Sequence, residues 1–141
     1  MATDPAELTP ASIAFMTERH LATFTTLRRD GSPHAVPVGF TWDAEELVAR
    51  VIASRRSAKV VQARAGRRAA LTQFDGRRWI SLEGTTRVLE DAASVHDAEQ
   101  RYAVRYRRPR PNPERVVVVL DVDRVLGGAW PDPLPPSPYA T

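Results

Sequence analysis

The 141-residue sequence predicts a small, mainly β barrel with short helices, built from antiparallel hairpins. Two observations favour this fold class. In residues 21–27, Leu21, Thr23, Thr25 and Leu27 alternate with Ala22, Phe24 and Thr26, so that the two sets would face opposite sides of an extended chain. This period of two is typical of a half-buried strand. Asp-Gly pairs at 30–31 and 75–76 each follow such a stretch, and this dipeptide favours tight hairpin turns. Successive hairpins are typical of closed antiparallel sheets, whereas parallel strands need long crossover connections.

Further strands are expected where apolar and β-branched residues are concentrated. They cover residues 33–42, 47–53, 68–74, 78–89 and 115–126. Gly84 lies inside one of these segments and predicts a β-bulge or a close backbone approach. The run 116–120 is apolar at every position, so that strand is expected to be buried on both faces.

Three helices are expected, over residues 9–16, 57–64 and 92–107. Thr9 precedes Pro10, a pairing typical of an N-cap followed by the first helical turn. Three prolines in 108–113 predict an extended linker. We expect one domain over 1–128 and a proline-rich tail over 129–141, either disordered or lying over a partner.

The composition excludes several classes of function. The sequence has no cysteine, so it has no disulfide, thiolate nucleophile or cysteine-ligated metal. Its three histidines are scattered without metal-ligand spacing, so no metal is expected. Aromatic residues are few and not interleaved with the cations, which argues against a nucleic-acid partner. No segment is typical of a membrane span or signal peptide, so we expect a cytoplasmic protein.

Lys59 is the only lysine among twenty basic side chains. It follows the apolar run 47–52 and the turn Ser54-Arg55-Arg56-Ser57-Ala58. N–H groups at the start of a helix carry partial positive charge and favour anions such as phosphate. Ser57 is expected to cap this helix, and Lys59 adds a point charge. A capped surface helix with a solvated lysine is the alternative, because such helix starts are common.

Three groups of motifs follow one another between residues 20 and 128. They are 21–27 with Ser32-Pro33-His34-Ala35-Val36-Pro37-Val38-Gly39-Phe40; then Ser57-Ala58-Lys59, Gln73-Phe74-Asp75-Gly76-Arg77-Arg78-Trp79 and Ser81-Leu82-Glu83-Gly84; and finally 101–113. The first group resembles the split β-barrel of pyridoxamine-phosphate-oxidase-like flavoproteins. The second resembles the flavin/deazaflavin oxidoreductase B group within that fold. The third is similar to the F420-dependent biliverdin reductases of that group.

This resemblance implies a set of cofactor-binding residues. The turn and helix start supply the phosphate clip through Ser54, Arg56, Ser57, Ala58 and Lys59. Pro37, Val38 and Gly39 face the ring, where a missing side chain would let the ring approach the backbone. Trp79 reaches the cofactor from the other subunit of a homodimer. Trp79 as an ordinary core aromatic and Gly39 as a simple strand bulge are the alternative readings.

The function implied by the resemblance is hydride transfer from reduced coenzyme F420 to a conjugated acceptor, biliverdin being the favoured one. The protein would orient its ligands, and no catalytic side chain is assigned. An FMN-dependent oxidoreductase is an alternative, because FMN also carries a ribityl phosphate. A non-enzymatic flavin- or haem-binding module is the other alternative. The proton donor and the substrate-binding arginines are left open.

Overall fold

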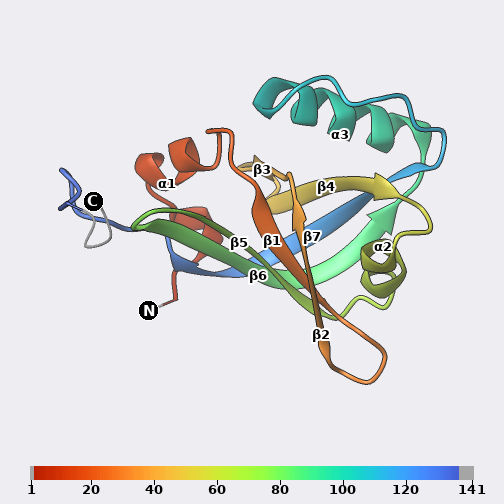
Figure 1. Cartoon of the computed structure of the whole chain (residues 1–141), viewed down its shortest axis with the longest axis horizontal. Coiled ribbons are helices and arrows are strands. Elements are labelled where there is room, and N and C mark those ends of the chain that lie inside the picture. The colour runs from red at the N-terminus through yellow and green to blue at the C-terminus, as the bar shows by residue number, and fades with distance from the viewer. Residues whose placement is uncertain (1, 137–141) are drawn as a thin grey trace.

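A computed structural model of the chain, which describes residues 2–136, contains seven strands and three α-helices (Figure 1). The strands are β1 (Ala22–Leu27), β2 (Pro33–Val38), β3 (Thr41–Asp43), β4 (Val48–Ser54), β5 (Arg68–Asp75), β6 (Arg78–Leu89) and β7 (Arg115–Gly127). The helices are α1 (Pro10–Phe15), α2 (Ala58–Ala63) and α3 (Ala92–Arg105), with a 3-10 turn η1 (Pro5–Glu7) before them. The mainly β fold expected from the alternation and the Asp-Gly turns is confirmed.

All seven strands form one antiparallel sheet in the order β2-β1-β5-β6-β7-β4-β3. The prediction of one strand over 33–42 is wrong, because the chain changes neighbours in the middle of it. Val38 is the last residue paired with β1, and Thr41 is the first paired with β4. Gly39 and Phe40 therefore connect the two outer strands of the sheet, and the barrel is split at this point.

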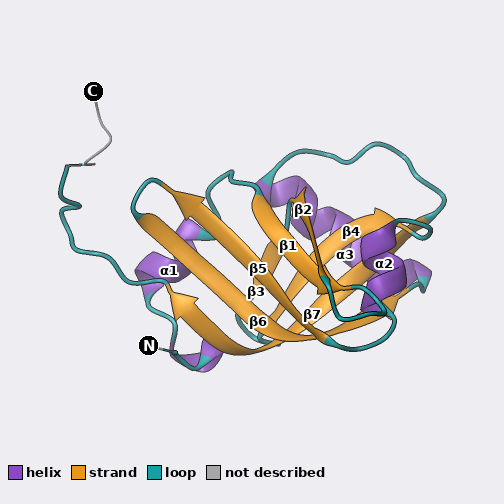
Figure 2. Cartoon of the chain, turned by 60° about the horizontal axis from the view of Figure 1, so that its bottom comes forward, coloured by secondary structure: helices purple, strands orange, loops and turns teal. Residues whose placement is uncertain are grey.

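The curved sheet encloses the main core, and two helices fill its ends. Figure 2 shows α1 toward one end of the twisted sheet and α2 toward the other. Phe15 and Met16 at the end of α1 and Val60 and Ala63 of α2 are buried in this cluster. Thr9 caps α1, as predicted, by accepting a hydrogen bond from the backbone N–H of Ser12 at 3.1 Å.

A smaller core lies between α3 and the outer face of β4 and β7, and it contains Val48, Ala98, Val117 and Val119. The main cluster holds the alternate positions Val116, Val118 and Leu120 of the same strand. The prediction that 116–120 is buried on both faces is therefore confirmed. This packing fixes α3 along β4, so the C-terminal end of α3 has a defined position in the fold.

The bulge predicted at Gly84 is confirmed by a shift in the β6–β7 register between Glu83 and Gly84. A Cβ atom on Gly84 would lie 1.8 Å from the backbone oxygen of Asp121, so only glycine permits the approach. Trp130 packs edge-on against Phe15, with 5.2 Å between ring centroids, and anchors the start of the tail. The tail beyond residue 136 lies outside the described residues.

No helix in residues 2–136 is both long and apolar enough to cross a membrane.

Candidate functional site

A polar cavity of about 520 Å³ lies between β2, β4, α2 and α3 and is bordered by residues 106–114, which we call the strap. Its lining residues are Pro37, Val38, Gly39, Ile52, Ala53, Ser54, Lys59, Tyr102, Arg107, Pro109, Arg110, Asn112 and Arg115. Five predicted site residues from two distant segments thus meet in one cavity. They are Pro37, Val38, Gly39, Ser54 and Lys59.

The cavity is strongly cationic. Lys59 is half-buried and has no hydrogen bond or ion pair with any residue in 2–136. Burial lowers the pKa of the Lys59 ammonium, because desolvation disfavours its charged form. Arg107 and Arg110 also form no ion pair with a described residue, and no carboxylate lines the cavity. A half-buried ammonium without an anionic partner is expected to bind a phosphate or carboxylate.

The helix start differs in detail from the prediction. The Ser57 hydroxyl does not cap α2; it donates to the backbone oxygen of Ser54 at 2.9 Å. The Ser57 N–H donates to the same oxygen at 3.0 Å, and together they form a tight turn after β4. Arg56 and Ala58 are exposed, and neither they nor Ser57 line the cavity. Of this segment, only Ser54 and Lys59 reach the cavity wall.

The strap is held at its far end by three hydrogen bonds, and a fourth fixes Arg115 just beyond it. The Asn112 amide donates to the Ser54 hydroxyl at 2.9 Å, and the Arg55 N–H donates to the Glu114 carbonyl at 2.8 Å. Arg115 donates to the carbonyl of Arg110 at 2.7 Å and to the carboxylate of Glu99 at 2.5 Å. Prolines further restrict the backbone between these points. The strap therefore presents Arg107 and Arg110 to the cavity from a fixed segment.

Gly39 is surrounded differently from what was expected. A Cβ atom on Gly39 would lie 3.0 Å from the ring of Tyr106 and 3.1 Å from the ring of Tyr102. The side of Gly39 from which a side chain would project is thus filled by Tyr102 of α3 and by Tyr106 just after it, whose ring centroids are 4.9 Å apart. Tyr102 lies in the helix expected over 92–107, and nothing in the spacing of its residues indicated that it lines a cavity.

Trp79 lies far from this cavity within the chain. It pairs with Phe74 at the β5–β6 hairpin, near α1, and its side chain is 45% exposed. Phe74 is 68% exposed, and Leu21, which directly precedes the Ala22–Gln73 pair of the β1–β5 register, is 64% exposed. We call Leu21, Phe74 and Trp79 the apolar patch. The reading of Trp79 as an ordinary core aromatic is wrong.

A second cavity, of about 420 Å³, lies between α1, β3 and α3 and is mainly apolar. Ile13, Met16, Trp42 and Val104 form much of its wall. Its Arg101 is already paired with Asp97 at 2.9 Å. Arg105, the other cation of the wall, donates to the carbonyls of Glu18 and Phe40 and to the Gln73 side chain, so neither arginine is left without a partner for a phosphate to satisfy.

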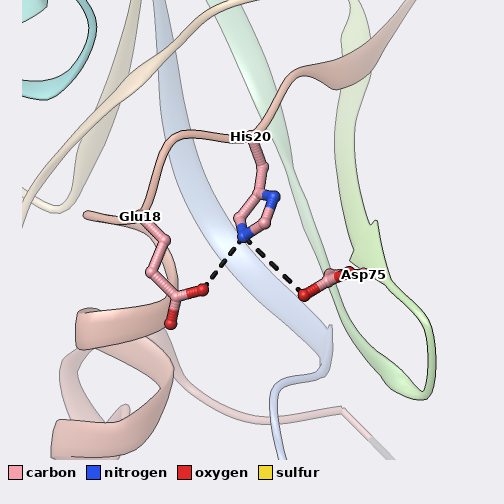
Figure 3. A group of neighbouring side chains, drawn as sticks. All are labelled: Glu18, His20 and Asp75. Carbon is pink, nitrogen blue, oxygen red and sulfur yellow. Dashed lines mark hydrogen bonds and ion pairs between the residues drawn. The ribbon is translucent and has the colours of Figure 1, made fainter.

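Figure 3 shows Glu18 and His20, two residues apart in the segment before β1, beside Asp75 at the end of β5. His20 Nε2 lies 3.0 Å from Glu18 and 4.0 Å from Asp75. The Arg78 guanidinium donates to both carboxylates, at 2.8 Å to Glu18 and 2.6 Å to Asp75. Since a cation already neutralises these carboxylates, we interpret the group as an ion-pair network. Hydrogen bonds from Arg78, and then from His20, lower the pKa of Glu18 to about 2.

Comparison with known proteins is consistent with this architecture. The sequence model of the pyridoxamine 5'-phosphate oxidase family matches residues 8–127. The chain belongs to this family. It is 52% identical over 129 residues to a protein of Mycobacterium tuberculosis (strain CDC 1551 / Oshkosh) named F420H(2)-dependent biliverdin reductase. The match covers 92% of this chain and 94% of that relative.

Solved structures share the fold at low sequence identity. A conserved hypothetical protein of Mycobacterium tuberculosis superposes with a TM-score of 0.71 at 22% identity, covering 84% of this chain and 82% of its own. A structure named F420 reductase has a TM-score of 0.63 at 21% identity, covering 80% of this chain and 94% of its own. The split barrel expected from the motif order is therefore confirmed.

We predict that Glu18 makes the stability of the fold depend on acid pH. A carboxyl whose pKa falls from 4.5 to about 2 on folding contributes stability above pH 4.5 that is lost as the pH falls toward 2. Glu18→Gln should lower the free energy of unfolding at neutral pH and flatten its decrease between about pH 5 and 2. Denaturant unfolding across this range measures both effects. Glu46→Gln is the control, since Glu46 is exposed and forms no ion pair with a described residue. Equal slopes for wild type and Glu18→Gln would contradict the prediction.

Proposed function

We propose that the chain is an oxidoreductase that transfers a hydride from reduced coenzyme F420 to a conjugated acceptor, and that this acceptor is biliverdin. The observation that carries the proposal is the 52% identity, over nearly the whole of both chains, to an F420H(2)-dependent biliverdin reductase. The cation-lined cavity supports it independently, because an anionic ligand suits Lys59 and the two unpaired arginines.

The residues that would hold the cofactor divide into two groups. Lys59 and Ser54 would bind the phosphate, whereas Arg56, Ser57 and Ala58 form the adjoining turn without lining the cavity. Pro37, Val38 and Gly39 would form the wall beside the ring, together with Tyr102. Bound F420H2 supplies the hydride. No carboxylate or imidazole lines the described cavity. The roles left to the chain's own residues are therefore to bind and orient the cofactor and the acceptor and to exclude water.

FMN is the alternative cofactor, because Lys59 would accept its phosphate equally well. The distribution of charge favours the more anionic ligand. Arg107 and Arg110 supply two further unpaired cations beyond Lys59, which is more positive charge than one phosphate requires. A non-enzymatic binding module would show ligand binding without turnover.

We also propose a homodimer in which the apolar patch is covered by a second copy. Three large apolar side chains exposed at one end of the sheet, two of them a cross-strand pair, are typical of an interaction surface. The outer face of β4 and β7 is covered by α3, whereas the side chains of the apolar patch stay exposed among the described residues. Within one copy, Trp79 and the cavity lie toward opposite ends of the sheet. In such a dimer Trp79 of one copy would reach the cavity of the other.

The test of the proposed reaction is a side-by-side assay of the purified protein. We expect biliverdin to oxidise F420H2, with little turnover when NADPH replaces it, because the sequence has no Gly-rich dinucleotide motif. Binding of F420, FMN and haem is measured in parallel. Binding of F420 without oxidation of F420H2 by biliverdin would reject the acceptor but keep the cavity.

Lys59→Ala should weaken cofactor binding without changing the fold. Loss of one charge-assisted hydrogen bond costs about 1.5–3 kcal/mol, or about ten- to a hundred-fold in affinity. Titration of F420 and FMN gives the dissociation constants, and thermal melting checks the fold. Arg108→Gln is the matched control, because it removes a positive charge from the strap without lining the cavity. Equal affinities for wild type and Lys59→Ala would remove Lys59 from the site.

Phe74→Ser with Trp79→Ser should convert the dimer to a monomer and reduce cofactor affinity, because both the interface and the partner's Trp79 are lost. Sedimentation gives the mass, and titration with F420 gives the affinity. Val104→Ser is the control, since Val104 is 89% exposed but lies outside the apolar patch. A wild-type protein that stays monomeric, and whose F420 dissociation constant does not change with protein concentration, would contradict this arrangement.

A further inference from the structure

Arg105, the last residue of α3, is buried without an acidic partner. Arg105 is only 6% exposed, and no carboxylate in residues 2–136 lies within ion-pair distance of its guanidinium. The guanidinium donates instead to neutral oxygens. Nε donates to the Glu18 carbonyl at 2.9 Å, Nη1 to the Phe40 carbonyl at 2.6 Å, and Nη2 to the Gln73 side chain at 2.5 Å.

These partners come from three separate segments of the fold. Glu18 precedes β1, Phe40 lies between β2 and β3, and Gln73 is in β5. Gln73 is itself fixed, because its amide donates to the Phe15 carbonyl at 3.0 Å. The guanidinium also stacks on the Phe40 ring, 4.7 Å from its centroid. One side chain thus joins the end of α3 to the connection between the outer strands.

Tyr106 acts on the same connection from the next position. Its hydroxyl donates to the His20 carbonyl at 2.7 Å and accepts from the Phe40 N–H at 3.2 Å. Burial raises the pKa of Tyr106, so the hydroxyl stays protonated and can make both bonds at neutral pH. Both backbone polar groups of Phe40 are therefore bound by side chains of Arg105 and Tyr106.

This arrangement replaces strand pairing where the sheet has none. Gly39 and Phe40 follow the last residue paired with β1 and precede the first residue paired with β4. Their peptide is consequently oriented by α3 and not by a ladder. Gly39 lines the polar cavity, and the Tyr106 ring lies against it. The strap, with Arg107 and Arg110, begins at Tyr106 itself.

We propose that Arg105 and Tyr106, which we call the latch, are positioning residues for the proposed cofactor and reaction. The latch holds the Gly39 wall and the first cation of the strap in fixed positions relative to Lys59. The inference rests on the proposed function, because it assigns the latch to the cofactor cavity. An arginine used only for stability would be a poor choice here, since burying a charge opposite neutral carbonyls costs more than burying an apolar side chain.

Tyr106→Phe and Arg105→Lys test the latch. Tyr106→Phe keeps the ring against Gly39 and removes only the two hydroxyl hydrogen bonds. Arg105→Lys keeps the charge but cannot reach three segments at once. We expect the dissociation constant of F420 to rise about ten-fold in Tyr106→Phe, and at least as much in Arg105→Lys, because each loses two or more positioning hydrogen bonds. Fluorescence titration with oxidised F420 measures this without turnover.

The control separates positioning from stability. Val125→Ala removes buried methyl groups near the end of β7 away from the cavity, where Val125 opposes Leu82. It should lower the melting temperature and leave the F420 dissociation constant unchanged. Latch variants that lose melting temperature but bind F420 like Val125→Ala would overturn the proposal. So would wild-type affinity in Arg105→Lys, because charge alone would then suffice.

The same titration distinguishes failure of the latch from failure of the proposed function. Wild-type protein that binds F420 but does not reduce biliverdin refutes the acceptor and leaves the latch to be judged on affinity alone. Wild-type protein that binds only FMN refutes the F420 assignment, and the variants are then compared with FMN. Wild-type protein that binds neither overturns both proposals.

Discussion

The change of sheet edge at Gly39 and Phe40 is the constraint on which the candidate site depends. An antiparallel barrel could close by pairing its outer strands, but β2 and β3 are consecutive in the chain and lie at opposite ends of the sheet order. Phe40 consequently has buried backbone groups without a ladder partner, and such groups must be satisfied elsewhere. The C-terminal turn of α3 satisfies them. Cavity wall and helix end are thus one structural unit.

Two cations illustrate how the chain separates architecture from ligand binding. The Arg105 guanidinium donates hydrogen bonds to oxygen acceptors of the fold, whereas half-buried Lys59 has no partner among the described residues. Burial penalises both charges. For Arg105 the penalty is offset within the fold, and for Lys59 it would be offset by an anionic ligand. Of these two cations, Lys59 is therefore the one whose burial penalty an anionic ligand would offset.

Local signals in the sequence predicted most of the fold. Alternation, Asp-Gly turns and the apolar run of β7 each involve neighbouring residues, and the strands they indicated are present within one or two residues. The break after Val38 was missed because it depends on which strands lie beside it. The Ser57 cap failed for a similar reason, since the same hydroxyl finds a nearer acceptor in the preceding turn.

The site was predictable only in part, because its residues come from segments whose proximity no spacing reveals. Lys59 was noticeable as the only lysine, and the resemblance supplied Pro37, Val38 and Gly39. Tyr102 and Asn112 lie in the segment 101–113 that carried the resemblance, but no role was assigned to either, although both line the cavity. They reach it because α3 packs on β4 and β7 and because the strap returns to Ser54. Hydrophobic burial that holds α3 in place therefore also determines which polar groups surround the proposed ligand.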